Sequence, residues 1–147
     1  MKTTSADIPK ADSFLSLPTR ETILVVDDHP PLCKVAEILL QRCGYRVLTA
    51  YDAFQAKEIV RRNRDIALLL TDIEMPGTAG DELAEWFHAH RPDAAVVFMS
   101  GNHIQQRRLA GYPFIEKPFV HLDTLVTTIR EAIHPPRAAR QAAQFAA

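Results

Sequence analysis

The sequence predicts an α/β protein in which a five-stranded parallel sheet is covered by helices on both faces. Five short apolar segments alternate with amphipathic segments along the 147 residues, a pattern typical of βαβ units with right-handed crossovers. Residues 66–70, with the sequence IALLL, are apolar without interruption, as in a strand that is buried on both faces. A buried helix fits this run equally well, but Pro76 and Gly77 break the chain soon after it. The length suits one domain with a sizeable core.

The five predicted strands are rich in β-branched and large apolar residues and are bounded by turn residues or charges. They lie at residues 22–26, 45–50, 66–72, 94–99 and 113–116. The second strand alternates only weakly between apolar and polar residues, which predicts a place near an edge of the sheet.

Helices are predicted between these strands from their apolar periodicity. The first begins at Pro30 and Pro31, which suit an opening turn, and ends near Gly44. Its predicted inward positions are Leu32, Val35, Ala36, Leu39 and Leu40. The second helix follows the candidate N-cap Asp52, and its predicted inward positions are Ala53, Ala56, Ile59 and Val60.

A third helix is predicted to begin at Asp81 and Glu82 and to run to His90. No further ligand residues lie near His88 and His90, so we expect surface histidines there and no metal site. The last predicted helix ends before Pro135, and its inward positions are Leu122, Leu125, Val126, Ile129 and Ile133.

Polar side chains stand at four predicted strand ends: Asp27 with Asp28, then Asp72, Ser100 and Lys117. The carboxyl ends of parallel strands share one edge of a sheet, so these groups are expected to converge. Three carboxylates in one pocket repel one another unless a cation offsets their charge, and Mg²⁺ prefers such oxygen ligands. A lysine adds a mobile positive charge. This set is suited to phosphoryl transfer, in which one carboxylate acts as the nucleophile and becomes an aspartyl phosphate.

Composition excludes several other classes of protein. The formal charge is −1 with 24% charged residues, so the basic signature of direct DNA binding is missing. No apolar run approaches the roughly 18 residues of a membrane span, and the N-terminus lacks the apolar core of a leader. Cys33 and Cys43 lie on one predicted helix, roughly 15 Å apart along its axis, too far for a disulfide. We therefore expect a cytoplasmic protein with two buried thiols.

From about Thr22 to Ile133 the chain resembles the receiver domain of bacterial two-component response regulators. The match is carried by Val25-Val26-Asp27-Asp28, Asp72 with Met75-Pro76-Gly77, Ser100-Gly101 and Lys117-Pro118-Phe119. The resemblance implies a flavodoxin-like, doubly wound sheet with strand order 2-1-3-4-5. It also implies a signalling phosphoacceptor that catalyses only its own phosphorylation and dephosphorylation.

The resemblance assigns roles to individual residues. Asp72 would accept a phosphoryl group from a phosphohistidine on a histidine kinase or a histidine phosphotransfer protein. Asp27 and Asp28 would hold Mg²⁺, Asp28 more directly, together with Asp72 and the backbone carbonyl of Glu74. Lys117 would contact the phosphoryl oxygens, aimed by a cis peptide bond into Pro118.

Two further residues are expected to switch the domain. The Ser100 hydroxyl would move toward the phosphoryl group, and the aromatic ring of Phe114 would turn inward to change the binding of a downstream protein target. Phe114 fits equally well as an ordinary packing residue.

One departure from the family pattern lies between Ser100 and Lys117, where residues 101–116 form a shorter connection than receivers commonly have. The fourth helix of the fold, between the fourth and fifth strands, is therefore expected to be short or absent. A reduced fourth helix resembles receivers that belong to, or work with, hybrid sensor kinases.

The expected organisation is a flexible N-terminal tail at 1–20, a receiver domain at 21–134 and a C-terminal tail at 135–147, with no room for an output module. Three alternatives compete with this interpretation. A Mg²⁺-dependent phosphohydrolase of the haloacid dehalogenase type would use the same aspartyl intermediate, with Glu74 as its general acid-base. Such an enzyme would also be expected to have a cap domain, which is not predicted here. A flavodoxin-like cofactor binder would want a phosphate-cradling loop after the first strand. A degenerate receiver would have lost reactive positions that are all filled here.

Overall fold

The computed structural model describes residues 21–101, 111–119, 121–136 and 138. This part of the chain contains five strands and four helices. In chain order the elements are β1 (Thr22–Val26), α2 (Pro30–Arg42), β2 (Arg46–Ala50), α3 (Ala53–Arg62), β3 (Ile66–Asp72), α4 (Gly80–His90), β4 (Ala95–Ser100), β5 (Phe114–Glu116) and α6 (Leu122–Ile133).

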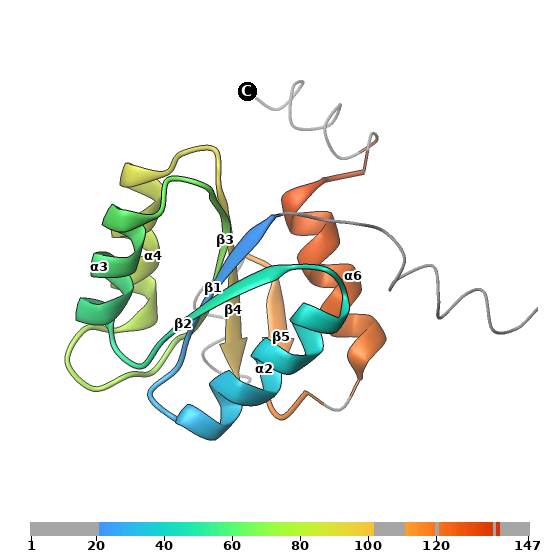
Figure 1. The fold of residues 1–147 in the computed structure, drawn as a ribbon, viewed down its shortest axis with the longest axis horizontal. Coiled ribbons are helices and arrows are strands. Elements are labelled where there is room, and N and C mark those ends of the chain that lie inside the picture. Colours follow the sequence, from blue (N-terminus) through green and yellow to red (C-terminus); the bar gives the residue numbers. More distant parts are fainter. Residues whose placement is uncertain (1–20, 102–110, 120, 137, 139–147) are drawn as a thin grey trace, which may run out of the picture.

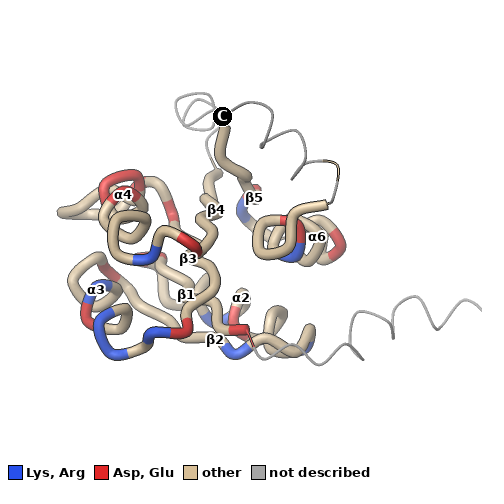
Figure 2. The backbone as a smooth tube through the Cα atoms, turned by 90° about the horizontal axis from the view of Figure 1, so that it is seen from above, with Lys and Arg blue, Asp and Glu red and all other residues tan. Residues whose placement is uncertain are grey.

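The strands form one sheet in the order β2-β1-β3-β4-β5, and every neighbouring pair is parallel. This confirms the predicted strand order and the predicted edge position of β2. Helices α3 and α4 cover one face of the sheet, and α2 and α6 cover the other (Figure 1). Figure 2, which looks along the strands, shows the sheet between these two helical layers.

Strand β3 is buried on both faces because each face has its own apolar core. Leu68 and Leu70 belong to the cluster under α2 and α6, whereas Leu69 belongs to the cluster under α3 and α4. Successive side chains of a strand point to opposite faces, so an uninterrupted apolar run fills both cores. The carboxyl end of this central strand is thereby held rigidly, and Asp72 is its last residue.

The helix boundaries follow the local signals in the sequence. Helix α2 has proline at its first two positions. Helix α3 is capped by Asp52, whose Oδ1 accepts a hydrogen bond of 2.7 Å from the Gln55 backbone N–H, and its last turn carries Arg61 and Arg62. Carboxylates that cap helix N-termini and cations near C-termini both stabilise the helix.

Two predicted inward positions are wrong. Val35 of α2 is 44% exposed and Leu122 of α6 is 43% exposed. Cys33 is buried in the first turns of α2, where Val35 was expected to face the core. The buried face of this helix is therefore narrower than predicted and is rotated around the helix axis. Leu122 is the first residue of α6, and the helix becomes buried only one turn later, at Leu125 and Val126.

Some predictions concern residues outside the described part. The N-terminal tail at 1–20, most of the C-terminal tail and the fourth-helix region at 102–110 lie there. The connection between β4 and β5 consists of residues 101–113. Within the described ranges, no helix is both long and apolar enough to cross a membrane.

Candidate phosphoacceptor site

The predicted site residues meet at the carboxyl edge of the sheet. Asp27 and Asp28 directly follow β1, Asp72 ends β3, and Ser100 ends β4. Lys117 follows β5, and its backbone N–H donates to the Ser100 carbonyl at 3.2 Å. The parallel register places these strand ends side by side, which is why four segments far apart in sequence form one site.

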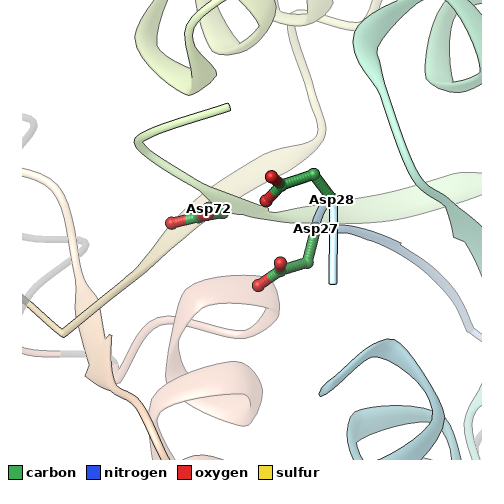
Figure 3. Close-up of side chains that lie close together, drawn as sticks. All are labelled: Asp27, Asp28 and Asp72. Carbon is green, nitrogen blue, oxygen red and sulfur yellow. The ribbon is translucent and has the colours of Figure 1, made fainter. Parts of the chain in front are cut away.

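Asp27, Asp28 and Asp72 form a compact acidic group. One carboxylate oxygen of each lies within 4.8 Å of the others, and all three side chains extend to the same side of the strand ends (Figure 3). Asp27 is 1% exposed and Asp72 is 7% exposed, whereas Asp28 is exposed. Three carboxylates at this spacing fit a hard divalent cation such as Mg²⁺.

Among the described residues, this is the only group of three or more His, Cys, Asp or Glu side chains arranged closely enough to hold a metal ion. His88 and His90 are exposed. His90 stacks on the ring of Trp86, with 4.1 Å between the ring centroids. These two histidines therefore belong to the surface of α4, as the sequence predicts.

Lys117 connects two of the acids. Its Nζ donates to Asp27 Oδ2 at 3.0 Å and lies 3.3 Å from Asp72 Oδ1. The peptide bond between Lys117 and Pro118 is cis. The other oxygen of Asp27, Oδ1, accepts a hydrogen bond of 2.9 Å from the backbone N–H of His29. Asp27 is thus fixed on both oxygens.

Burial and charge act against each other at the centre of the site. Burial raises the pKa of Asp72; the charge of Lys117 partly opposes this rise, and the charge of Asp27 adds to it. Burial also works to lower the pKa of Lys117, but the hydrogen bond to Asp27 and the charges of both acids outweigh it and raise that pKa. Lys117 is therefore protonated at neutral pH. Three acids facing one ammonium leave a surplus of negative charge, which a bound cation would offset.

Ser100 and Phe114 lie on the neighbouring strands β4 and β5. Ser100 is 4% exposed. Phe114 is partly buried and pairs with Phe98 of β4 in the sheet register, with 5.7 Å between the ring centroids. The Phe98 ring also meets Tyr112 edge-on, at 5.3 Å. Phe114 and Tyr112 thus both contact the Phe98 ring at the β5 edge of the sheet.

Glu74 lies in the loop that follows Asp72, and its side chain is exposed. A hydrogen bond from its backbone works to lower the pKa of Asp72. The expected role of the Glu74 carbonyl as a metal ligand stays a prediction.

Sequence reasoning missed two residues that shape this site. Gly80 begins α4, and its N–H donates to the Ile73 carbonyl at 2.8 Å. A Cβ at Gly80 would overlap the Asp72 carbonyl oxygen and lie 2.8 Å from the Asp72 carbonyl carbon. Cys33 donates its thiol hydrogen bond to the Asp27 carbonyl at 3.3 Å. Glycine is a poor helix former, so its presence beside the start of a predicted helix was the one signal for the first; nothing in the sequence marked the second.

Residues 23–130 match the family model described as the response regulator receiver domain. The chain belongs to this family. A phosphoacceptor role in two-component signalling follows from that membership, and the phosphohydrolase alternative is not favoured.

Individual relatives agree with this assignment. The receiver is 30% identical over 129 residues to the C4-dicarboxylate transport transcriptional regulatory protein DctD of Pseudomonas aeruginosa, covering 84% of this chain and 28% of that protein. It is 36% identical over 96 residues to the two-component response regulator ORR23 of Oryza sativa, covering 65% of this chain and 14% of that protein. The chain therefore spans less than a third of the length of these two relatives.

Solved structures give the same fold. A response regulator receiver domain protein from Clostridium thermocellum superposes with a TM-score of 0.69 at 28% identity, covering 77% of this chain and 94% of the other. The receiver domain of the hybrid histidine kinase CckA superposes with a TM-score of 0.66 at 32% identity, covering 77% of this chain and 99% of the other.

Proposed function

We propose that Asp72 of this receiver is the residue that accepts the phosphoryl group. The observation that carries this proposal is the position of Lys117, whose Nζ lies 3.3 Å from Asp72 Oδ1 beside a compact group of three acids. An Asp72 oxygen attacks the phosphorus of a phosphohistidine, the O–P bond forms, and the P–N bond to the histidine breaks. Lys117 then neutralises part of the charge on the transferred phosphoryl oxygens.

The residues at this edge fit Mg²⁺ as the cofactor of that transfer. Asp27, Asp28, Asp72 and the backbone carbonyl of Glu74 would hold it, with Asp28 as the most accessible ligand. When bound, Mg²⁺ supplies positive charge that compensates the phosphoryl oxygens and the crowded carboxylates. Asp27, whose oxygens accept from Lys117 and from the His29 N–H, would also keep Lys117 pointed at Asp72.

Incubating the protein with acetyl phosphate and Mg²⁺ is expected to add one phosphoryl group per chain. Intact-mass spectrometry measures the addition, and brief alkaline treatment is expected to remove it because an acyl phosphate is hydrolysed by base. The same incubation with EDTA in place of Mg²⁺ is the control and is expected to leave the mass unchanged. A phosphoryl group that is stable to alkali, or that is added equally well in the presence of EDTA, would contradict the proposed chemistry.

Asp28→Asn is expected to weaken Mg²⁺ binding by at least about tenfold, because it removes a carboxylate from the cation site. Isothermal titration calorimetry measures the dissociation constant. Asp52→Asn is a matched control, since it removes an exposed carboxylate at the same edge while asparagine preserves the cap of α3. Equal affinities of the two variants would remove Asp28 from the metal site.

We further propose that Ser100 and Phe114 form the switch. Beryllofluoride, a phosphoryl mimic, added with Mg²⁺ is expected to shift the ring resonances of Phe114 in NMR spectra, and Ser100→Ala is expected to reduce this shift. The reason is that the hydroxyl couples the phosphoryl oxygens to β5. The buried ring of Phe87, on α4, is the internal control. A Phe114 shift of equal size in both proteins would remove Ser100 from the switch, and the absence of a Phe114 shift in the unmodified protein would make Phe114 a packing residue.

The partners follow from this chemistry. A histidine kinase or a histidine phosphotransfer protein would donate the phosphoryl group, and a downstream protein would bind the phosphorylated receiver, whose boundaries we place at 21–134. The receiver would act as a signalling phosphoacceptor without turning over a separate substrate and without touching DNA, given a formal charge of −1. Cys33 and Cys43 are free thiols, which suits the reducing cytoplasm.

A further inference from the structure

The polar groups of Asp27 are held from four directions. Its backbone N–H donates to the Ala50 carbonyl at 3.2 Å, and its two carboxylate oxygens accept from the His29 N–H and from Lys117. Its backbone carbonyl accepts from the thiol of Cys33 at 3.3 Å. Cys33 is therefore, besides Lys117, a side chain that fixes this residue directly.

The thiol of Cys33 lies between the ends of two strands. Its Sγ is 3.3 Å from the carbonyl oxygen of Asp27, just after β1, and 3.7 Å from that of Ala50, the last residue of β2. The side chain is 1% exposed, so water does not replace it as the donor. In this enclosed position even a weak thiol donor lowers the cost of burying the Asp27 carbonyl oxygen; the Ala50 carbonyl already accepts from the Asp27 backbone N–H.

The Asp27 carbonyl matters because it belongs to the peptide group that leads to Asp28. A peptide group is planar, so the direction of this carbonyl sets the direction in which the chain leaves for the Cα of Asp28. The side chain of Asp28 is exposed, so little packing defines its position. The orientation of its carboxylate toward Asp27 and Asp72 thus depends on the backbone that precedes it.

We infer that Cys33 is a positioning residue for the cation site: its thiol orients the Asp27–Asp28 peptide group and so places the Asp28 carboxylate beside Asp72. This inference rests on the proposed role of Asp28 in binding Mg²⁺. Cys33 itself touches neither the cation nor the phosphoryl group.

Three replacements of Cys33 test the inference through Mg²⁺ affinity. Cys33→Val fills the site without a donor and is expected to raise the Mg²⁺ dissociation constant about threefold to fivefold, the size that loss of one modest hydrogen bond gives. Cys33→Ala is expected to behave alike, and Cys33→Ser, which keeps a donor, is expected to stay within about twofold of the unmodified protein. Cys43→Ala, which alters the other buried thiol at the end of α2, is the control and is expected to leave the affinity unchanged.

Two further measurements separate positioning from a general loss of structure. At saturating Mg²⁺, Cys33→Val is expected to be phosphorylated by acetyl phosphate at nearly the unmodified rate. In the Asp28→Asn background, Cys33→Val is expected to cause no additional loss of Mg²⁺ affinity, because the residue acts through Asp28.

Additive losses in the double variant, or an unchanged dissociation constant in Cys33→Val, would overturn the inference. The proposed function fails in a different way, namely if the unmodified protein binds no Mg²⁺ and is not labelled. If Cys33→Val and Cys33→Ala do not fold, Cys33→Ser still tests the inference. Serine keeps a hydrogen-bond donor, so a loss of Mg²⁺ affinity in Cys33→Ser as large as that of Asp28→Asn would contradict the inference.

Discussion

Asp72→Asn is expected to reduce labelling by acetyl phosphate to the detection limit, at saturating Mg²⁺ and neutral pH. An amide has the size and shape of the carboxylate but offers no anionic oxygen to form an acyl phosphate. Asp27 is not expected to replace it, because its carboxylate is held on both oxygens, by the His29 N–H and by Lys117, and the residue is only 1% exposed against 7% for Asp72. Intact-mass spectrometry of the variant, beside the unmodified protein, measures the loss.

The control for this experiment is Asp93→Asn, which removes an exposed carboxylate from the loop before β4, at the opposite edge of the sheet. It is expected to be labelled as fully as the unmodified protein. Circular dichroism establishes that Asp72→Asn is folded, and one phosphoryl group persisting in that folded variant would place the acceptor at another residue.

The same replacement has a consequence for stability. Because burial raises the pKa of Asp72, the ionised carboxylate is less favourable in the folded chain than in the unfolded chain. A carboxyl group whose pKa is raised by folding stabilises the folded chain fully at a pH below its unfolded pKa of 3.8. This stabilisation is lost as the pH rises through the pKa of the folded chain. In the absence of divalent cations, the stability of Asp72→Asn relative to the unmodified protein should therefore increase from pH 4 toward neutrality, in keeping with a site built for a cation.

The fold was predictable from the sequence because its signals are local and periodic. An apolar run such as that of β3 fills two cores, whichever residues lie opposite. The site was predictable for a related reason. In a parallel sheet all strands end at one edge, so Asp27, Asp72, Ser100 and Lys117 had to converge once the five strands were located.

The features that could not be predicted depend on contacts between elements. Val35 and Leu122 have the apolar character of inward residues, yet whether either is covered depends on how far the neighbouring strands and helices extend. Cys33 has no pattern that distinguishes it from a core alanine; its role emerges only because the Asp27 carbonyl lies 3.3 Å away. Gly80 likewise has a role only through its approach to the backbone of β3.

Gly80→Ala is expected to lower the free energy of unfolding by at least about 2 kcal/mol, measured by urea denaturation. Two opposing effects decide the sign. Alanine in place of glycine favours a helix by about 1 kcal/mol. Against this, the added Cβ would overlap the Asp72 carbonyl oxygen and lie 2.9 Å from the Ile73 Cα. These are backbone atoms that no side-chain rotation relieves, and overpacking of this kind costs about 1–3 kcal/mol or more.

Gly77→Ala, in the loop that leads to α4, separates steric overlap from backbone conformation. Gly77 has a φ of +85°, and a Cβ added there would have no other atom within 4 Å, so alanine costs only the left-handed conformation, about 1–2 kcal/mol. Gly80→Ala should therefore be the more damaging change. It should also slow labelling by acetyl phosphate more than tenfold while the protein is still folded, because α4 can accommodate the methyl group only by displacing the end of β3 that carries Asp72. A smaller loss of stability for Gly80→Ala than for Gly77→Ala would show that α4 moves aside without disturbing the strand, and the close packing of this helix start would then have no part in holding the phosphoacceptor.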